Sequence, residues 1–230
     1  MPAKKTSSRG RTGSGHAKAG RCRIIAGHWR GRIISFDDAE GLRPTTDRIR
    51  ETVFNWLNPY IPGSHCLDCF AGSGVLGLEA LSRGAAEVVF IENNRQSWEN
   101  LKRNIDMLQE ADGSDAAGRA RLYHEDAIRF LRSISRTSAV DSASKPVQGD
   151  RSAHDLARFD LVFLDPPFHK NLLSQGCSLL DNSGCLAEDA IIYVEHAIDE
   201  DVEMPANWDC VKHKVAGQVA YKLYIVTHTR

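Results

Sequence analysis

Residues 66–92, which read CLDCFAGSGVLGLEALSRGAAEVVFIE, decide the fold that we expect for the rest of the chain. Two short apolar runs, 66–70 and 87–92, enclose a stretch with helical spacing, and a glycine-rich turn joins the first run to that stretch. A strand, a helix and a second strand in this order form a βαβ unit, in which the two strands are parallel. The stretch therefore predicts the start of a parallel sheet with helices on its faces.

The same alternation continues toward the C-terminus. Three further apolar runs lie at 121–126, 160–165 and 190–196. They alternate with helical patterns that start at Arg95, Ala127 and Leu172. The last two runs, 210–215 and 219–227, are joined only by a short turn, which favours a closing antiparallel hairpin. The predicted fold class is α/β, a Rossmann-like, mostly parallel seven-stranded sheet with a C-terminal antiparallel hairpin.

Two segments precede this sheet, and one interrupts it. Residues 22–36 hold two β-prone runs, which predict a small β-hairpin within an appendage of residues 22–42. Apolar residues at helical spacing after Pro44 predict a capped helix over about 45–58. The main domain is expected to span 43–230, with a polar, Ser-rich flexible insertion over 137–157.

Composition narrows the class of protein. A chain of 230 residues with 42% hydrophobic and 26% charged residues is long enough for one sizeable α/β domain. It has no apolar run near the roughly 20 residues that cross a bilayer, and no apolar segment follows the basic start as in a secretory signal. We therefore expect a cytoplasmic protein without a membrane span. Six cysteines in this setting predict reduced thiols, and we interpret Cys66 and Cys69 as buried structural thiols.

A basic arm, residues 1–21, precedes the expected appendage. The first 23 residues hold seven lysines and arginines and no acid, whereas the whole chain has a net charge of −1. We expect the arm to be disordered and to suit a polyanionic partner, because each phosphate that it neutralises releases counterions. A solubilising tail is the alternative, and charge alone does not separate the two. The candidate phosphate contacts in the arm are Lys4, Lys5, Arg9 and Arg11.

The glycine-rich turn after the first apolar run is a candidate cofactor loop. Its glycines allow a tight turn and let the backbone approach a ligand, whose polar groups can meet the free amides of the following helix. A purely structural turn is the alternative, because the loop lacks both the Gly-x-Gly-x-x-Gly spacing of dinucleotide binders and the Gly-Lys-Ser/Thr ending of a phosphate loop. The candidate residues are Asp68, Phe70, Ala71, Gly72, Ser73 and Gly74.

Acidic residues end the next two predicted strands. Glu92 can accept hydrogen bonds from both ribose hydroxyls of an adenosine. Asp126, with Ala127 behind it, is the candidate for the adenine amino group, and Glu125 competes for this role. A solvated acid at a strand end is the alternative for each of them. Three turns at one edge of a parallel sheet nevertheless favour a ligand crevice there.

Asp165-Pro166-Pro167-Phe168 follows the apolar strand directly and is the most specific signal. The prolines stiffen the loop, so that the Asp165 carboxylate and the Pro166 carbonyl are fixed acceptors. Both can accept from an aromatic NH2 group, so that its lone pair points at an electrophilic methyl group, and Phe168 offers a face for stacking a base. An ordinary turn is the alternative for an isolated motif. Beside the candidate cofactor loop, these four residues predict catalysis of methyl transfer to an exocyclic amine.

Several blocks of the sequence resemble the RsmD family. These blocks are RPTTDRIRETVFNWL (43–57), DCFAGSG with LGLEA behind it (68–80), DPPF (165–168) and VAGQVAY (215–221). The RsmD family comprises bacterial methyltransferases of class I fold that modify the N2 atom of a guanine in 16S ribosomal RNA. The similarity covers roughly residues 23–226. The basic arm and the 137–157 insertion are longer than the family leads us to expect, which leaves open how the RNA is approached.

The resemblance implies a cofactor, a partner and a set of roles. S-adenosyl-L-methionine would lie with its methionine part at residues 68–74, its ribose at Glu92 and its adenine at Asp126. Residues 165–168 would present the target guanine of 16S rRNA, within an assembled or partly assembled small ribosomal subunit. A single in-line transfer needs no metal and no cysteine nucleophile. We expect a monomer.

Other arginines are candidate phosphate contacts, namely Arg30, Arg32 and Arg43. For Arg48 and Arg50 a surface pair with Glu51 or another neighbour on the helix is the preferred interpretation. Two other functions remain open. Adenine-N6 methylation of DNA would use the same Asp-Pro-Pro-aromatic geometry, although we find no separate target-recognition domain. A non-catalytic RNA-binding assembly factor could keep the fold, although intact Asp165, Glu92 and the glycine loop count against it.

Removing residues 1–20 should weaken binding to RNA and flatten its salt dependence. The slope of log Kd against log salt concentration is expected to fall by about 0.7 for each lost contact with single-stranded phosphate. Fluorescence anisotropy with labelled rRNA fragments at several salt concentrations measures this slope. An unchanged slope would leave the arm as a solubilising tail.

Overall fold

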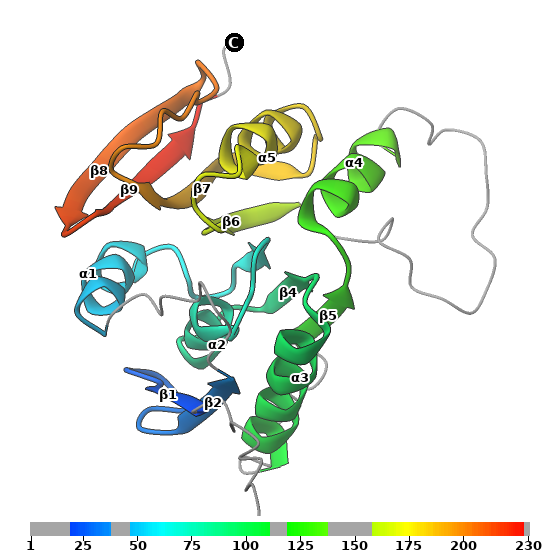
Figure 1. The fold of residues 1–230 in the computed structure, drawn as a ribbon, viewed down its shortest axis with the longest axis vertical. Helices are drawn as coiled ribbons and strands as arrows, with labels where there is room; N and C mark the ends of the chain where they lie inside the picture. The colour runs from blue at the N-terminus through cyan, green and yellow to red at the C-terminus, as the bar shows by residue number, and fades with distance from the viewer. Residues whose placement is uncertain (1–18, 38–46, 111–118, 138–157, 228–230) are drawn as a thin grey trace, which may run out of the picture.

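A seven-stranded sheet carries the fold, and a separate two-stranded hairpin lies beside it in the computed structural model (Figure 1). The structure describes residues 19–37, 47–110, 119–137 and 158–227. The N-terminal part contributes β1 (Ala19–Arg23), β2 (Ile33–Asp37) and α1 (Asp47–Leu57). The main domain follows as β3 (His65–Asp68), α2 (Val75–Ser82), β4 (Glu87–Glu92), α3 (Arg95–Glu110), β5 (Ala120–His124), α4 (Ala127–Thr137), β6 (Phe159–Leu164), α5 (Leu172–Asp181), β7 (Leu186–Ala197), β8 (Trp208–Ala216) and β9 (Val219–Val226).

The strands of the large sheet lie in the order β5-β4-β3-β6-β7-β9-β8. The first five are parallel to their neighbours, whereas β9 is antiparallel to both β7 and β8. β1 and β2 pair with each other as an antiparallel hairpin. The predicted fold class is therefore confirmed, including the closing C-terminal hairpin and the small N-terminal one.

Two predicted strands end earlier than their apolar runs suggest. β3 ends at Asp68 rather than Phe70, because Ala71 donates its amide to the Ile91 carbonyl at 3.0 Å and the chain already turns over β4. β5 ends at His124 rather than Asp126. In both cases the run of residues that predicted the strand continues past the last hydrogen bond of the sheet. The periodicity of apolar residues does not show where that hydrogen bonding ends.

The N-terminal boundaries shift by a few residues as well. β1 begins at Ala19, before the expected start of the appendage at residue 22. α1 spans 47–57 within the predicted 45–58, and residues 45 and 46 lie outside the described part of the chain. Thr137 ends α4, while the remainder of the predicted 137–157 insertion and all of the basic arm before residue 19 also lie outside it.

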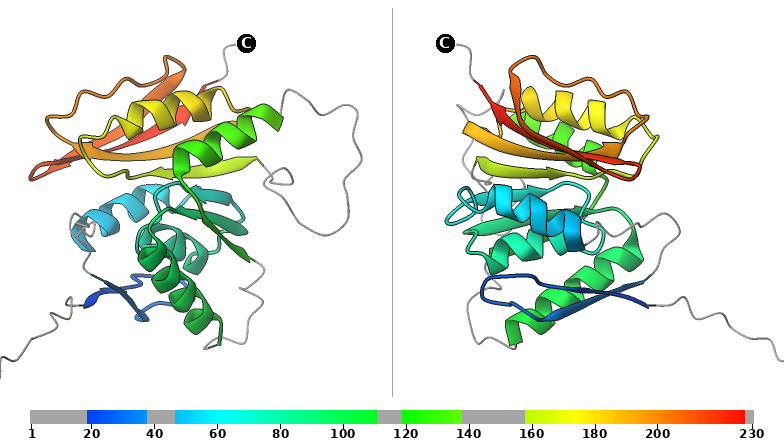
Figure 2. Two further views of the ribbon diagram at one scale, coloured as in Figure 1. Left: turned by 45° about the vertical axis from the view of Figure 1, so that its right-hand side comes forward. Right: turned by 90° about the vertical axis from the view of Figure 1, so that its left-hand side faces the viewer.

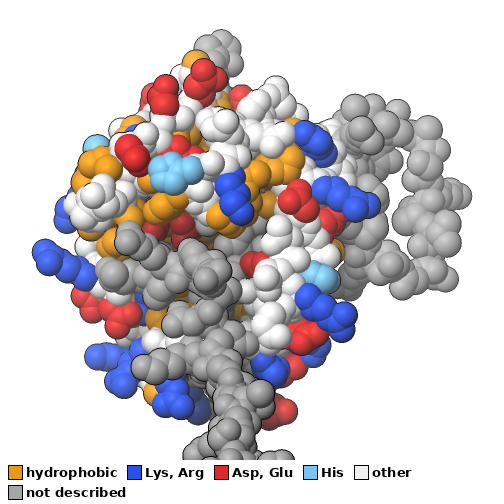
Figure 3. Space-filling view, viewed as in Figure 1, with side chains coloured by type: hydrophobic (Ala, Val, Ile, Leu, Met, Phe, Trp, Pro, Cys, Tyr) orange, Lys and Arg blue, Asp and Glu red, His pale blue; other side chains and the backbone are white. Residues whose placement is uncertain are grey.

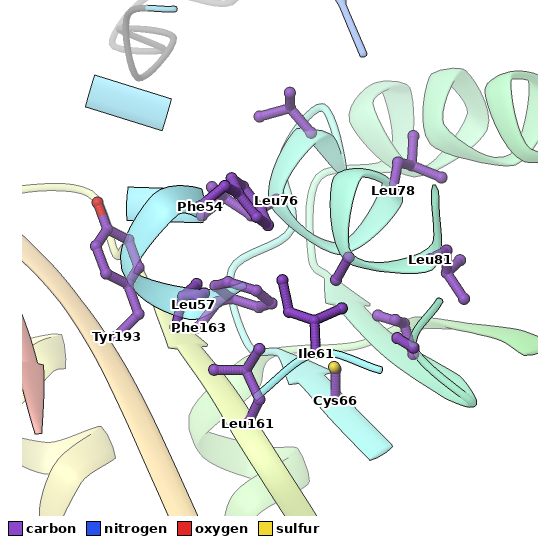
Figure 4. Packing of buried hydrophobic residues seen from close by; sticks show 14 of the residues in the cluster. Phe54, Leu57, Ile61, Cys66, Leu76, Leu78, Leu81, Leu161, Phe163 and Tyr193 are labelled. Atoms are coloured by element: carbon purple, nitrogen blue, oxygen red, sulfur yellow. The ribbon is translucent and has the colours of Figure 1, made fainter. Parts of the chain in front are cut away.

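The helices cover both faces of the sheet (Figure 2). α1, α2 and α3 pack on one face in a cluster that includes Phe54, Phe163 and Tyr193 (Figure 4). α4 and α5 pack on the other face, against alternate residues of the same strands such as Val162 and Leu164. This alternation follows from the period of two in a strand. None of the helices in the described part of the chain is long and apolar enough to span a membrane.

Cys66 and Cys69 belong to opposite faces of the sheet. Each thiol is free and buried, one in each hydrophobic cluster. Burial raises the pKa of the Cys66 thiol to about 12 and also raises that of Cys69. The prediction that these two residues are buried structural thiols is confirmed, because both thiols are kept protonated and inert in apolar surroundings.

The loop between β1 and β2 is held by the C-terminal half of α2. The buried carboxylate of Glu79 accepts the amides of Ile25 and Ala26 at 2.7 and 3.0 Å. The Ser82 hydroxyl accepts the Trp29 amide at 2.9 Å and donates to the Ala26 carbonyl at 2.6 Å. These backbone contacts place the N-terminal hairpin against the main domain, so the appendage packs as part of one body.

Arg50 does not lie on the surface. The prediction that it forms a pair on the surface of the helix is therefore wrong as to its exposure. Its side chain is 0% exposed, and its guanidinium donates to Asp47 at 2.6 Å and to the Arg23 carbonyl at 3.0 Å. Glu79 lies 3.9 Å away and also pairs with Arg83 at 2.8 Å. Arg50 is buried because its guanidinium reaches the Arg23 carbonyl of β1 and lies near Glu79 of α2, which helical spacing alone does not predict.

Gly77 lets α2 pack closely on β4. A Cβ atom at this position would lie 2.2 Å from Cε1 of Phe90 and 2.9 Å from Cγ1 of Val88, both of them on the strand beneath. In α5, by contrast, a Cβ at Gly176 would meet only Leu164, at 3.8 Å. The two glycines are therefore alike in being helical and differ in the space around them.

Gly77→Ala should lower the free energy of unfolding by about 1–3 kcal/mol, because the added methyl group overpacks the interface between α2 and β4. Gly176→Ala is the matched control and should raise stability by about 0.5–1 kcal/mol, since alanine favours the helix and has room there. Urea unfolding of both variants measures the difference. Equal effects at the two positions would contradict the close approach at Gly77.

Candidate active site

The predicted functional residues gather at the carboxyl edge of the parallel strands. β3 is flanked by β4 on one side and by β6 on the other, both parallel to it. The connections after β3 and β6 therefore lead to opposite faces of the sheet, as the positions of α2 and α5 in Figure 1 show. A crevice opens at such a point of divergence, and ligands bind there in open α/β sheets.

The glycine loop is tied to the end of β4 by Glu92. The two oxygens of this buried carboxylate accept the Gly72 amide at 2.7 Å and the Asn94 amide at 2.6 Å. Gly72 and Gly74 both have positive φ, 52° and 76°, which glycine adopts without strain. A Cβ at Gly74 would also lie 2.2 Å from Cδ1 of Leu101. The loop is thus shaped by glycine and positioned by one acid.

Asp68 lies under the start of α2 and is 3% exposed. Its carboxylate accepts the amide of Gly77 at 3.2 Å. The pKa of Asp68 is raised from 3.8 to about 7, mainly by burial and to a smaller extent by the nearby charge of Glu92, while hydrogen bonds from the backbone of Gly77 and Phe70 oppose the rise. A carboxyl group whose pKa lies near neutral pH at the carboxyl edge of a parallel sheet is typical of a functional site.

Asp126 starts α4 instead of ending β5. Its carboxylate accepts the amide of Arg129 at 2.9 Å, as a residue that caps a helix does, and the side chain is exposed. Ala127 behind it is buried, and the Glu125 amide donates to the Glu92 carbonyl at 3.1 Å. The structure thus places Asp126 next to the turn that contains Glu92. The Asp126 carboxylate, however, also caps the start of α4.

The Asp165-Pro166-Pro167-Phe168 loop leaves β6 at the same edge. Asp165 is half-buried, Pro166 is buried, Pro167 is exposed and Phe168 is half-buried. The following residues His169 and Asn171 have φ values of 60° and 51°, and they are two of the three non-glycine residues with positive φ in the described part of the chain. Such backbone conformations are costly for side chains other than glycine and cluster at functional sites. Nothing in the sequence after the motif predicted them.

Two further residues lie beside this loop and were missed from the sequence. Tyr193 and Glu195 were assigned only to a strand, yet Glu195 is 4% exposed and Tyr193 is fully buried. The Tyr193 hydroxyl donates to Oε2 of Glu195 at 2.7 Å. A glutamate directly after the apolar run AIIYV is the signal that could have found them, because buried carboxylates are rare without a partner.

The two candidate RNA contacts that the structure describes do not lie at this edge. Arg30 and Arg32 are exposed on the loop between β1 and β2, which contacts the end of α2 opposite the glycine loop. On the face seen in Figure 3, basic and acidic side chains are interspersed, and on α3 they pair as Arg95 with Glu99 and Lys102 with Asp106. Outside the described residues lie the other candidates, Lys4, Lys5, Arg9, Arg11 and Arg43.

The residues present fit S-adenosyl-L-methionine. A glycine loop opens next to Glu92, whose carboxylate has about four acceptor positions and uses two of them for backbone amides. The acids Glu92 and Asp165 lie at this edge, which suits a ligand with a cationic sulfonium and ammonium. Among the residues described, no group of three or more His, Cys, Asp or Glu side chains is arranged to hold a metal ion.

Comparison with known proteins agrees with this geometry. The family model Cons_hypoth95, described as conserved hypothetical protein 95, matches residues 22–144 and 139–225. Ribosomal RNA small subunit methyltransferase D of Escherichia coli strain K12 is 44% identical over 210 residues, which cover 91% of this chain and 92% of that protein. Its counterpart from Haemophilus influenzae is 43% identical over 205 residues, with 89% and 94% covered. The solved structure of Escherichia coli yhhF, 44% identical, matches with a TM-score of 0.71 over 91% of this chain and 100% of that one.

The strand order and the residues at the carboxyl edge define a class I S-adenosylmethionine-dependent methyltransferase. Within that class the chain belongs to the Cons_hypoth95 family, the RsmD family of small-subunit ribosomal RNA methyltransferases.

Asp68→Asn should flatten the pH dependence of stability between about pH 4 and pH 7. The folded protein keeps a proton on Asp68 up to about pH 7, whereas the unfolded chain loses it near 3.8, so the free energy of unfolding falls as pH rises through this window. In the variant, the slope of the free energy of unfolding against pH should be smaller by up to about 1.4 kcal/mol per pH unit. Urea unfolding at several pH values measures it, with Asp209→Asn on the exposed face of β8 as the control. The same slope in Asp68→Asn and wild type would refute the raised pKa.

Proposed function

We propose that this protein transfers the methyl group of S-adenosyl-L-methionine to the exocyclic N2 of a guanine in 16S rRNA. The substrate is the small ribosomal subunit or its assembly intermediate in the cytoplasm, and the enzyme acts as a monomer. The observation that carries the proposal is the position of Asp165, which follows β6 directly beside the glycine loop of β3. Family membership supports rRNA as the substrate.

The cofactor supplies an electrophilic methyl group, so the protein's own residues need only bind, orient and polarise. The Asp165 carboxylate and the Pro166 carbonyl accept from the amine, which directs the nitrogen lone pair toward the methyl group. The proton leaves late, because the amine becomes acidic only as its bond to carbon forms. Asp165 therefore acts as an acceptor and does not have to be a strong base during attack.

Phe168 and the residues that follow it shape the place of the base. The ring is half-buried, so one part packs on the protein and another remains open for stacking. Stacking of a base on an aromatic ring contributes about 1–3 kcal/mol. The positive φ values at His169 and Asn171 hold the loop in a conformation that a regular strand-to-helix turn does not need. We assign this rigidity to presentation of an unstacked guanine, which is cheapest to extrude from a loop or single strand.

The cofactor roles follow the same edge. Residues 68–74 hold the methionine part, Glu92 accepts from the ribose hydroxyls, and Asp126 with Ala127 borders the adenine. Arg30, Arg32, Arg43 and the basic arm supply contacts to phosphate. Since Arg30 and Arg32 lie at the end of α2 remote from the glycine loop, the RNA has to extend along the side of the domain that carries the N-terminal hairpin.

One assay separates this function from the two alternatives. The protein is incubated with labelled S-adenosylmethionine and small subunits from cells that lack the activity, beside naked rRNA and duplex DNA. Label in the subunit RNA, located on guanine N2 by digestion and mass spectrometry, is the expected result. Label on DNA adenine alone would overturn the proposal, and cofactor binding without any transfer would identify a non-catalytic assembly factor.

Asp165→Ala should reduce turnover by at least about 100-fold, as loss of a positioned polar group in a transition state does. Cofactor affinity should change by less than about 3-fold, because Asp165 contacts the amine and not the cofactor loop. Single-turnover methylation and equilibrium binding of S-adenosylhomocysteine measure the two quantities. Asp209→Ala, an exposed acid on β8, is the control. Substantial residual turnover in Asp165→Ala would remove the role given to its carboxylate.

A further inference from the structure

Two exposed lysines of β8 lie on the face of the sheet that α1 covers. Lys212 is opposite Leu223 in the antiparallel pairing of β8 and β9, and Lys214 is opposite Tyr221. Both partners belong to the hydrophobic cluster on the α1 face. Because directly opposite residues of paired strands share a face, the two lysines point to the α1 side. Within the part of the chain that the structure describes, neither lysine forms an ion pair with an acid.

A row of paired residues leads from the Asp-Pro-Pro-Phe loop to Lys214. Asp165 and Glu195 are the next positions after the paired residues of β6 and β7. Glu195 is opposite Tyr221 of β9, and Tyr221 is opposite Lys214 of β8. Neighbouring strands lie about 4.8 Å apart, so three steps across the sheet place the backbone of Lys214 about 14 Å from that of Asp165. A short stretch of RNA spans this distance from a base held at Asp165.

Trp56 of α1 holds the side chain of Lys214. The lysine Nζ lies 5.9 Å from the centroid of the Trp56 ring, which in turn stacks on Tyr221 with a centroid distance of 5.5 Å and an interplanar angle of 28°. The face of an indole ring attracts a cation. A side chain that is already restrained loses less rotamer freedom when it binds a phosphate. The contact therefore prepares the ammonium group for an anionic partner on its open side.

The opposite face of this part of the sheet carries acids. Residues 198–207, between β7 and β8, contain four acids and no lysine or arginine. Val202 and Met204 of this segment pack against the cluster under α4 and α5. Asp199 lies 4.0 Å from His169, which directly follows the Asp-Pro-Pro-Phe motif. Negative charge on that side repels a phosphate backbone, whereas the lysines on the α1 side attract it.

The α1 side is continuous with the N-terminal hairpin. Figures 1 and 2 show the end of the β8–β9 hairpin, α1 and the β1–β2 hairpin following one another along one side of the domain. The contact between Lys214 and Trp56 joins β8 to α1, and the hydrogen bond from Arg50 to the Arg23 carbonyl at 3.0 Å joins α1 to β1. The exposed Arg30 and Arg32 lie on the loop of that hairpin.

We propose that Lys212 and Lys214 bind phosphates of the rRNA strand next to the target guanine. The strand then crosses the α1 side of the domain toward the N-terminal hairpin. This inference rests on the proposed function and assigns its RNA-binding surface to a part of the protein that is far from the basic arm in the sequence. It also gives the RNA a direction, away from the acidic segment 198–207.

The competing explanation is protection of a sheet edge. β8 is the last strand of the large sheet, and charged side chains on an edge strand prevent its pairing with another sheet. The sign of the charge separates the two roles. A glutamate blocks an edge as well as a lysine does, but it repels a phosphate.

Lys212→Gln combined with Lys214→Gln should reduce the slope of log Kd against log salt concentration by about 1.4, because two contacts with single-stranded phosphate are lost. Binding near 0.1 M salt should weaken by about 10-fold or more for the same reason. Fluorescence anisotropy with a labelled rRNA fragment that contains the target guanine measures both quantities. An unchanged slope would overturn the inference.

Arg95→Gln combined with Lys102→Gln is the matched control. It removes two positive charges from α3, each of which is paired with an acid, at 3.0 and 2.8 Å. The net charge changes as in the lysine variant, but the slope should stay close to that of wild type. The same fall of the slope in both double variants would show an effect of net charge alone and would overturn the assignment to β8.

Methylation of small subunits separates failure of this inference from failure of the proposed function. In the Lys212→Gln, Lys214→Gln variant KM should rise by about 10-fold, while kcat should stay within about 3-fold of wild type, because neither lysine contacts the reacting atoms. Transfer to guanine N2 by wild type with the same KM in the variant would overturn the inference alone. No transfer to guanine N2 by wild type would overturn the proposed function, and the inference with it.

Lys212→Glu combined with Lys214→Glu tests edge protection. This variant keeps the edge charged, so it should stay as monodisperse as wild type in size-exclusion chromatography with light scattering. Its affinity for the rRNA fragment should fall below that of the glutamine variant, because attraction becomes repulsion. Binding as tight as that of wild type would leave edge protection as the role of the lysines and overturn the inference. Thermal unfolding and S-adenosylhomocysteine binding show that each variant is folded.

Discussion

The divergence of the chain on the two sides of β3 is the constraint on which the site depends. β3 pairs in parallel with β4 on one side and with β6 on the other. The helices that follow β3 and β6 must cover opposite faces, so their first turns move apart and leave the carboxyl end of the central strands open. Asp68, Glu92 and Asp165 are far apart in the sequence and meet at this opening only because the strand order brings them there.

Buried acids then convert that opening into a defined site. Glu92 holds the glycine loop by its amides, and Asp68 lies under the first turn of α2. A third acid, Glu79, has a structural task at the other end of α2, where it accepts two amides of the N-terminal hairpin and pairs with arginine. The same short helix thus contacts the glycine loop at one end and the exposed Arg30 loop at the other, which fixes the distance between the candidate cofactor loop and two of the candidate RNA contacts.

The sequence predictions were accurate where local, regularly spaced residues decide the structure, and they were wrong where individual side-chain contacts decide it. Strands and helices with a clear period were correctly predicted, because a strand buried on both faces or a helix buried on one is visible in the spacing of apolar residues. Arg50 was expected on a helix surface and is buried, since its guanidinium donates to the Arg23 carbonyl of β1 and lies near Glu79 of α2, which are distant in the sequence. Asp126 was assigned to the end of a strand and starts a helix, because a side chain to backbone hydrogen bond decided the boundary. The individual cofactor and RNA roles stay predictions.

By itself the sequence determined the α/β alternation, the glycine loop, the Asp-Pro-Pro-Phe motif and the resemblance to one family, because each of these is written in residues that are adjacent or regularly spaced. Only the tertiary structure decided that Asp165 and Glu195 are neighbours, that the Tyr193 hydroxyl donates to Glu195, and that Arg30 and Arg32 lie on the loop at the far end of α2. The physical reason is strand register. A parallel pairing joins segments 30 residues apart in this case, and a shift of one residue would turn Glu195 to the opposite face of the sheet.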